Sequence, residues 1–209
     1  MEIPYVVKER PDTGLNNAKM AIWLFLASEV MLFGALFATY IFIRVLSPDF
    51  ASMKEMDLLL ENGETYRLKL NVPLAMLNTF VLITSSVTMV LSWAALKMNN
   101  PGKSAMWLAV TFLCGIGFMV IKAMEYGGKF KVDVYPSLNN FYGIYYTMTG
   151  LHGLHVVGGM VVMGYFLLVG KKMWNTEPER YAGRIEVTGL YWHFVDLVWI
   201  FLFPGLYLL

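Results

Sequence analysis

Five apolar runs, each long enough to cross a lipid bilayer as a helix, constrain this chain more than any other feature. They lie near 20–45, 73–96, 104–126, 141–169 and 187–208. A hydrocarbon core about 30 Å thick requires about 20 helical residues. Lipid tolerates only helices and closed barrels, and these runs lack the alternation of barrel strands. The sequence therefore predicts an all-α polytopic membrane protein, a bundle of five transmembrane helices that forms one domain over residues 1–209.

The composition favours a membrane location and argues against several functions. Charged residues make up 15% of the chain, against about 25% in a soluble domain. The net charge is +1, and the absence of a basic cluster argues against nucleic-acid binding. Cys114 is the single cysteine and lies in an apolar run, so we expect neither a disulfide framework nor a cysteine metal site. The first apolar run contains Glu29 and lacks a cleavage pattern, so we expect it to remain as the first helix.

The loops give an orientation. Five helices place the two termini on opposite sides of the membrane, and lysine and arginine favour the cytoplasmic side. Nine of the 16 basic residues lie on the N-terminal side, which predicts a cytoplasmic N-terminus and a periplasmic C-terminus. These nine are Lys8, Arg10, Lys19, Lys97, Lys103, Lys171, Lys172, Arg180 and Arg184. The longest connection, 46–72, is polar, and we expect a short surface helix within it.

Small and hydroxyl residues indicate where the helices pack. In the second run they form one stripe at spacings of seven, three and four, made of Asn78, Ser85, Thr88 and Ser92. Gly34 and Ala38 form a small-xxx-small pair in the first run, and the fourth run is rich in glycine. Such residues let helix backbones approach closely in lipid, where no hydrophobic force drives helices together. We interpret these stripes as structural.

Away from the ends of the apolar runs, the ionisable residues that remain are Glu29, His152, His155, His193 and Asp196. At about 1.5 Å per residue, Glu29 lies roughly 12 Å and Asp196 about 14 Å from the inner face. His193 lies about 9 Å and His155 about 21 Å from the same face. A charge inside a bilayer costs roughly 3 kcal/mol or more, so these residues require partners or a function. We expect the first, fourth and fifth helices to enclose them in one polar pocket.

Three readings of this pocket remain open. His152 or His155 could pair with His193 to ligate a haem, or the set could form a carboxylate–histidine metal site of the di-iron kind. The di-iron kind needs about six ligands, which the five residues do not supply. In the third reading the residues tie helices together, tune proton movement or anchor lipid, and the imidazole of His193 donates to Asp196. Lys122 and Glu125 are expected to reach water at the end of the third helix. No catalytic residue, metal site or cofactor site is expected in this chain.

Three stretches carry a family resemblance: "LASEVMLFGALFATYIFIR" at 26–44, "GLHGLHVVGG" at 150–159 and "YWHFVDLVWIFLF" at 191–203. With "PLAMLNTFVLITSSVTM" at 73–89 and "EY" at 125–126, they resemble subunit III of haem–copper cytochrome oxidases. The motifs occur in order from about residue 20 to the end of the chain. The resemblance implies a membrane subunit without its own haem or copper, packed against subunit I, whose partner subunits hold those cofactors. It also implies support of proton uptake, protection against inactivation during turnover, and bound phospholipid.

The resemblance also assigns roles to particular residues. Glu29 matches the carbodiimide-reactive acid of the family, His152 and His155 match its "HGLH" motif, and His193 and Asp196 match "WHFVD". Glu186 matches an acid that precedes that last motif. Lys171 and Lys172 are the nearest candidates for a lipid phosphate, because the basic residue expected near the end of the fourth helix is shifted.

The resemblance leaves the electron donor and the closest relatives open. This chain lacks the two N-terminal helices of the seven-helix form, and the five-helix form implies the plasma membrane of a bacterium. The family includes the equivalent subunit of quinol oxidases and a relative associated with nitric oxide reductase. A small proton-coupled transporter is an unrelated alternative, since Glu29 and Asp196 lie in the membrane. Against it, we find no inverted repeat and no pair of broken helices.

Overall fold

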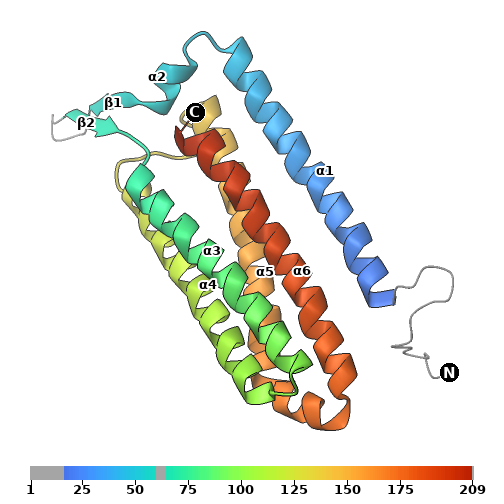
Figure 1. Cartoon of the computed structure of the whole chain (residues 1–209). Helices are drawn as coiled ribbons and strands as arrows, with labels where there is room; N and C mark the ends of the chain where they lie inside the picture. Colours follow the sequence, from blue (N-terminus) through green and yellow to red (C-terminus); the bar gives the residue numbers. More distant parts are fainter. Residues whose placement is uncertain (1–16, 60–64, 209) are drawn as a thin grey trace.

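Four long helices pack together, and a fifth lies along one side of them (Figure 1). The structure is a computed structural model that describes residues 17–59 and 65–208. The long helices are α1 (Asn17–Leu46), α3 (Val72–Lys97), α4 (Pro101–Phe130), α5 (Asn140–Thr176) and α6 (Pro178–Phe203). All five are long and apolar enough to cross a membrane, α6 together with the short π-helix η1 (Pro204–Leu208) that continues it. The prediction of a five-helix transmembrane bundle is confirmed.

Asparagine and proline fix where three of these helices begin. The side-chain oxygens of Asn71, Asn100 and Asn139 accept backbone N–H groups at the starts of α3, α4 and α5, at 3.1, 3.1 and 2.9 Å. Such caps satisfy donors that a helix start leaves unpaired. Proline occupies the first turn of α3, α4 and α6, where its missing N–H is harmless. Asn99 has a positive φ of 56° in the short α3–α4 connection, a conformation that asparagine tolerates.

The helices extend beyond the apolar runs that predicted them. We expected the fourth and fifth spans at 141–169 and 187–208, whereas α5 ends at Thr176 and α6 already begins at Pro178. At about 1.5 Å per residue, the 37 residues of α5 are longer than a hydrocarbon core. Hydropathy therefore located the membrane segments but not the polar ends of the helices.

The connection between α1 and α3 contains a hairpin that the sequence analysis missed. The expected short helix is present as α2 (Phe50–Lys54). It is followed by β1 (Met56–Leu59) and β2 (Thr65–Leu68), which pair antiparallel with Met56 opposite Leu68. The hairpin lies at the same end of the bundle as the C-terminal end of α6 (Figure 1).

The polar stripe of α3 is buried and bonded to its neighbours, as the sequence predicts. Thr88 and Thr111 of α4 share a hydrogen bond of 2.8 Å, and the Ser92 hydroxyl donates to the carbonyl of Ser104. On the α6 side, the Trp192 indole donates to Ser85 at 2.9 Å. The Gly34–Ala38 pair is different, because both residues are exposed. Within this chain the pair therefore packs against no other helix, and its role in helix association stays a prediction.

Candidate functional site

Glu29 of α1 and His155 of α5 form an ion pair or hydrogen bond inside the membrane span. Glu29 Oε2 lies 2.9 Å from His155 Nε2, and their side chains are 15% and 13% exposed. The edge of the Phe33 ring meets the His155 ring, with centroids 5.4 Å apart, and the Tyr191 hydroxyl of α6 donates to the His155 carbonyl. Two residues 126 positions apart are therefore held together where α1, α5 and α6 meet.

The hydrogen bond of His155 Nδ1 determines which protonation states the pair can adopt. Nδ1 lies 2.8 Å from the carbonyl oxygen of Leu151. Because a carbonyl can only accept, Nδ1 carries a proton in this hydrogen bond. The proton between Nε2 and Glu29 can then reside on either group, which gives a carboxylate with an imidazolium or two neutral groups. The geometry can hold and transfer a proton without a change of helix packing.

His193 and Asp196 of α6 do not bond to each other, which corrects the expected pair. The Nδ1 atom of His193 lies 2.5 Å from the hydroxyl of Ser86, so His193 ties α6 to α3. Asp196 is buried, and the Ser86 hydroxyl lies close to its carboxyl group. Neither carboxyl oxygen has a partner with full hydrogen-bond geometry among the described residues. The spacing of three placed both residues on one face, but the imidazole reaches across to the neighbouring helix.

His152 lies apart from the Glu29–His155 pair in the bundle core. Its ring contacts the edge of Phe118 and lies tilted against Trp199, with centroids 5.6 and 5.2 Å away. Neither of its nitrogens has a hydrogen-bond partner in the described part of the chain. Within residues 17–59 and 65–208, no hydrogen bond or ion pair joins Glu29 and His155 to His152, His193 or Asp196. The five residues are therefore not joined into one hydrogen-bonded cluster: the acid–histidine bond of Glu29 and His155 is separate from the bond of His193 to Ser86.

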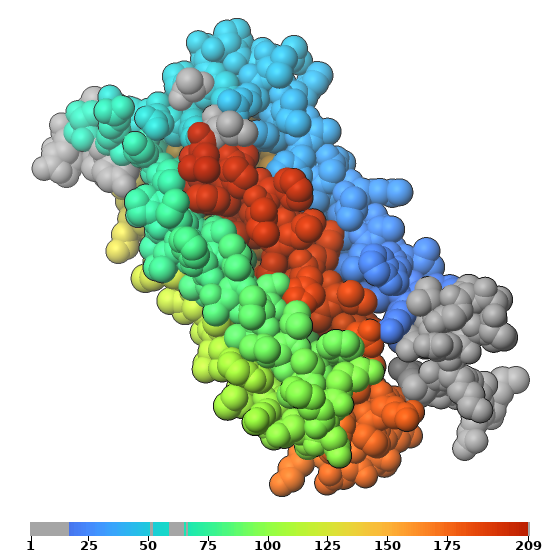
Figure 2. All heavy atoms as spheres, viewed as in Figure 1, coloured from blue at the N-terminus to red at the C-terminus, as the bar shows by residue number. Residues whose placement is uncertain are grey.

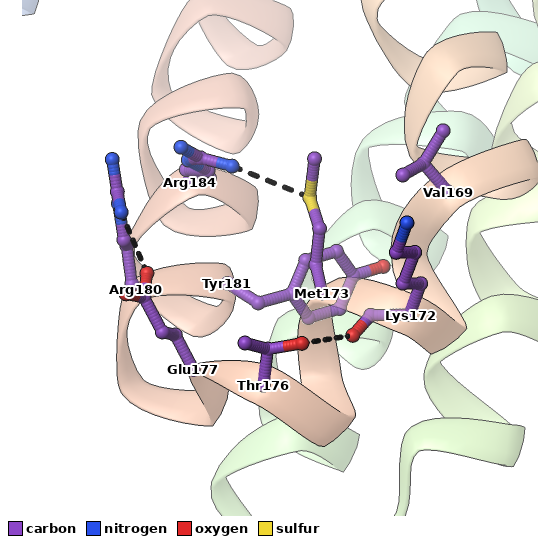
Figure 3. A pocket seen from close by; sticks show the side chains of 8 residues that line it. All are labelled: Val169, Lys172, Met173, Thr176, Glu177, Arg180, Tyr181 and Arg184. Atoms are coloured by element: carbon purple, nitrogen blue, oxygen red, sulfur yellow. Dashed lines mark hydrogen bonds and ion pairs between the residues drawn. The ribbon is translucent and has the colours of Figure 1, made fainter.

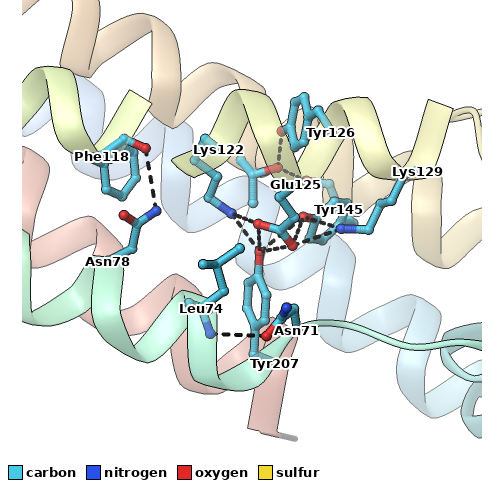
Figure 4. A network of polar contacts seen from close by, with 12 residues as sticks. Asn71, Leu74, Asn78, Phe118, Lys122, Glu125, Tyr126, Lys129, Tyr145 and Tyr207 are labelled. Atoms are coloured by element: carbon cyan, nitrogen blue, oxygen red, sulfur yellow. Dashed lines mark hydrogen bonds and ion pairs between the residues drawn. The ribbon is translucent and has the colours of Figure 1, made fainter. Parts of the chain in front are cut away.

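A second charged cluster, which the sequence analysis missed, lies near the end of α4 (Figure 4). That end of α4 is on the hairpin side of the bundle (Figure 1). The carboxylate of Glu125 accepts from Lys122 and Lys129, each at 2.8 Å. Its Oε1 atom also accepts hydrogen bonds of 2.9 Å from the hydroxyls of Tyr145 on α5 and Tyr207 on η1. The side chains of Lys122, Glu125 and Lys129 are 8%, 6% and 7% exposed. The expectation that Lys122 and Glu125 reach water is wrong, because α5 and η1 cover them.

Aromatic rings surround the two ammonium groups of this cluster. Lys122 lies 4.7 Å from the centroid of Trp199 and Lys129 lies 4.6 Å from that of Tyr145. Cations over ring faces gain roughly 0.5–2 kcal/mol each, more when they are shielded from water. The cluster joins α4, α5 and η1. The spacings of three and four between its charged residues are a signal that could have revealed it.

The proposed lipid-binding lysines lie at the opposite end of the bundle. Both Lys171 and Lys172 are exposed near the end of α5. Lys172 lines a pocket of about 340 Å³ with Arg180 and Arg184 of α6 (Figure 3). Glu177 pairs with Arg180 at 2.6 Å, and the Arg184 guanidinium contacts the sulfur of Met173 at 3.3 Å. Nearby, Lys19 pairs with Glu186 at 2.8 Å and ties the start of α1 to α6.

The described residues contain no group of three or more histidine, cysteine, aspartate or glutamate side chains arranged to hold a metal ion. The residues considered for a haem or di-iron site instead face other partners. His193 bonds to Ser86, His155 pairs with Glu29, and His152 lies between aromatic rings. The geometry supports proton exchange between Glu29 and His155, and His193 links α6 to α3.

These features define a polytopic helical membrane protein with paired acid and histidine side chains inside its span. The family model of cytochrome c oxidase subunit III matches residues 11–209. The chain therefore belongs to the subunit III family of haem–copper oxidases, which confirms the resemblance carried by the sequence motifs.

Individual relatives support the same assignment. Cytochrome c oxidase subunit 3 of Alkalihalophilus pseudofirmus is 31% identical over 203 residues, which cover 96% of this chain and 91% of the relative. The same subunit of Bacillus subtilis is 32% identical, covering 93% of this chain and 87% of the relative. Subunit 3 of the cytochrome bo(3) ubiquinol oxidase of Pseudomonas putida is also 32% identical, over 91% of this chain and 84% of that relative. The chain is thus a multi-pass protein of the bacterial membrane and part of a multi-subunit respiratory oxidase.

Proposed function

We propose that the chain is a non-redox subunit that packs directly against subunit I of the oxidase, stabilises it and supports proton uptake during aerobic electron transport. Haem and copper would belong to the partner subunits. The observation that carries the proposal is the Glu29–His155 pair, an acid and a base 2.9 Å apart within a membrane span. Ionisable groups in such positions are costly, and they commonly mark proton pathways.

The pair has the chemistry that proton delivery needs. Its shared proton can sit on Glu29 or on His155 Nε2, because Leu151 already binds the other ring nitrogen. Both side chains remain partly exposed, which leaves a route for proton exchange with a neighbouring surface. A partner subunit placed against α1 would receive that proton without any electron passing through this chain.

Lys171 and Lys172, near the end of α5, would bind the phosphate of a phospholipid. Lys172 shares a pocket with Arg180 and Arg184, and guanidinium groups suit phosphate oxygens. With the N-terminus in the cytoplasm, this pocket would face the inner leaflet. A cysteine at Lys171 that a membrane-impermeant thiol reagent labels only from the periplasm would contradict this orientation.

The identity of the electron donor depends on the other subunits of the complex rather than on this chain. Relatives at similar identity are named for cytochrome c and for ubiquinol oxidases, so quinol is the second candidate. The test is to purify the complex through a tag on this chain and compare oxidation of reduced cytochrome c with oxidation of a quinol. A chain that purifies without a haem–copper subunit would refute the proposal. Proton-coupled transport by the purified chain alone would favour the transporter alternative, and a Soret band on that chain would favour bis-histidine ligation of haem.

Carbodiimide labelling tests the role of Glu29. A hydrophobic carbodiimide reacts with a protonated acid in an apolar setting, so the wild-type chain should be labelled at Glu29. Glu29→Gln keeps the size and the hydrogen bond and should remain in the complex without being labelled. Glu29→Ala leaves His155 without this partner and should reduce assembly more. Labelling of the Glu29→Gln chain at the wild-type level would show that a different acid reacts.

A further inference from the structure

An apolar groove runs between α1 and α6 in the half of the bundle that carries the hairpin. It has a volume of about 430 Å³, and its walls include Phe33, Gly34, Phe37, Phe194, Phe201 and Gly205. The first and last α1 residues that line it are Val30 and Ile41. At about 1.5 Å per residue these are roughly 16 Å apart, close to the depth of one leaflet of a core about 30 Å thick. The two helices lie against each other as the blue and red surfaces of Figure 2.

Two cations lie beyond the end of this groove. Tyr40 supplies a polar hydroxyl to the groove wall. This hydroxyl donates to the Gly205 carbonyl at 2.5 Å and accepts a long hydrogen bond of 3.4 Å from Arg44. Arg44 lies in the last turn of α1, and Lys54 of α2 reaches the backbone of η1, with its ammonium 3.4 Å from the Tyr207 carbonyl. Both side chains are partly buried. They lie just past the apolar stretch of α1, where the phosphates of a lipid leaflet are expected.

The two cations lack an anionic partner within the described part of the chain. Among residues 17–59 and 65–208, no carboxylate lies within ion-pair distance of Arg44 or Lys54, and the neighbouring Glu55 instead lies 3.6 Å from Arg67. Burial and the nearby Arg44 guanidinium lower the pKa of the Lys54 ammonium, and the adjacent Glu55 carboxylate only partly offsets them. Two like charges held together in a partly buried position favour binding of an anion between them.

We propose that the α1–α6 groove binds an acyl chain of a phospholipid whose phosphate lies between Arg44 and Lys54. The groove supplies apolar walls as long as one leaflet, and the cations complement a phosphodiester at its end. The site is distinct from Lys171 and Lys172, which belong to the last turns of α5. That end of α5 lies away from the hairpin (Figure 1). It also goes beyond the proposed role of the subunit, because it assigns the bound lipid a structural task. The lipid fills the space beside α1 and links that helix to α6.

The test counts phospholipids that stay bound to the oxidase complex, purified through this chain, during extensive washing in mild detergent. The double substitution Arg44→Gln with Lys54→Gln removes both cations, and Gly34→Leu fills the groove. Gly34 lines the groove, and a Cβ at this position meets nothing within 4 Å, so a side chain can start there without displacing a neighbour. Native mass spectrometry should show that each variant retains one phospholipid fewer than the wild-type complex.

Matched controls separate this site from general effects. Gly117→Leu also places a side chain in open space, on α4, and Lys97→Gln with Lys103→Gln removes two exposed lysines elsewhere. Both controls should retain the wild-type number of lipids. Delipidated wild-type complex should regain the lost molecule from phosphatidylglycerol vesicles but not from vesicles of a diacyl glycolipid without phosphate.

Three results would overturn the proposal. The first is an unchanged lipid count in both the cation variant and the groove variant. The second is equal reloading by the glycolipid, which would show that phosphate is not recognised. The third is a complete cross-link from Leu197→Cys, on the groove wall, to another subunit, which would show that a protein segment fills the groove. The cation variant keeps the test decisive even where the Gly34→Leu chain does not assemble, because it changes only two polar side-chain ends.

Discussion

Glu125 is the residue on which the charged cluster near the hairpin depends. It accepts hydrogen bonds from two lysines and two tyrosines, and it is the carboxylate that both ammonium groups contact. Removing one partner of a buried ion pair is far more damaging than removing an exposed pair, because the remaining charge stays buried. The side chains of this cluster are nearly inaccessible, so solvent can do little to compensate.

We therefore expect Glu125→Gln to destabilise the folded chain by about 3–5 kcal/mol. The loss should appear as a lower midpoint of thermal unfolding, followed by circular dichroism in detergent. Glu55→Gln is the matched control, since its pair with Arg67 is exposed and should contribute less than about 1 kcal/mol. Equal midpoints for the two variants would mean that the cluster near the hairpin does not stabilise the bundle.

The sequence predicted single functional residues better than their partners. Glu29 and His155 were both selected as ionisable groups inside apolar runs, but they are 126 positions apart and depth alone did not pair them. His193 was expected to bond to Asp196, which shares its helix face. Its actual partner, Ser86, is an ordinary hydroxyl among several on α3. Partners across helices depend on how the helices rotate against each other, which one sequence does not specify.

At the scale of elements, α5 and α6 approach closely because of Gly159. A Cβ at this position would lie 2.7 Å from the Trp192 ring, whereas a Cβ at Gly150 on the same helix meets nothing within 4 Å. Trp192 is fully buried and also bonds to Ser85, so its ring cannot move aside easily. The glycine-rich run therefore contains positions that packing requires and positions that it does not.

Gly159→Leu should separate α5 from α6, whereas Gly150→Leu should be tolerated. Overpacking of a tight core typically costs about 1–3 kcal/mol, which here should reduce the amount of subunit found in the complex. The measurement is the ratio of this chain to haem in complexes purified through subunit I, with an unchanged haem spectrum. Similar ratios for the two variants would contradict the assigned role of Gly159.

The sequence predicted the membrane-spanning helices, which hydropathy defines, better than the short elements between them. Five apolar runs gave five helices, because lipid requires every backbone group to be bonded within the segment. The strands β1 and β2 were missed, although the Asn-Gly dipeptide between them is a turn signal in the sequence. The apolar period of such short strands resembles that of a surface helix, and four-residue segments give little pattern to separate the two.

At the scale of the whole molecule, α1 is the helix least covered by the rest of the chain. In its most apolar stretch 11% of the residues are buried, against 50% for the last span. Its exposed apolar face suits a partner subunit or lipid, and it carries Glu29 toward α5. Segments with few buried contacts open most readily, so the stability of α1 should depend on the assembled complex.

Hydrogen exchange should reveal this dependence. In the chain purified alone in detergent, backbone amides of α1 should exchange faster than those of α3 and α4. In the intact oxidase, α1 should gain more protection than either of those helices. Equal protection of α1 in both preparations would show that this chain alone holds the helix in place.

The most direct measurement for the whole account is oxygen consumption over many turnovers by assembled complexes carrying Glu29→Gln, His155→Gln or both. If the pair supports proton uptake without taking part in the core reaction, all three should start near the wild-type rate. Activity should then decay faster than in the wild type. The double variant should decay no faster than the worse single variant, because the two residues act as one unit. Immediate and complete loss of activity in a fully assembled Glu29→Gln complex would contradict the account, as would decay indistinguishable from wild type in all three.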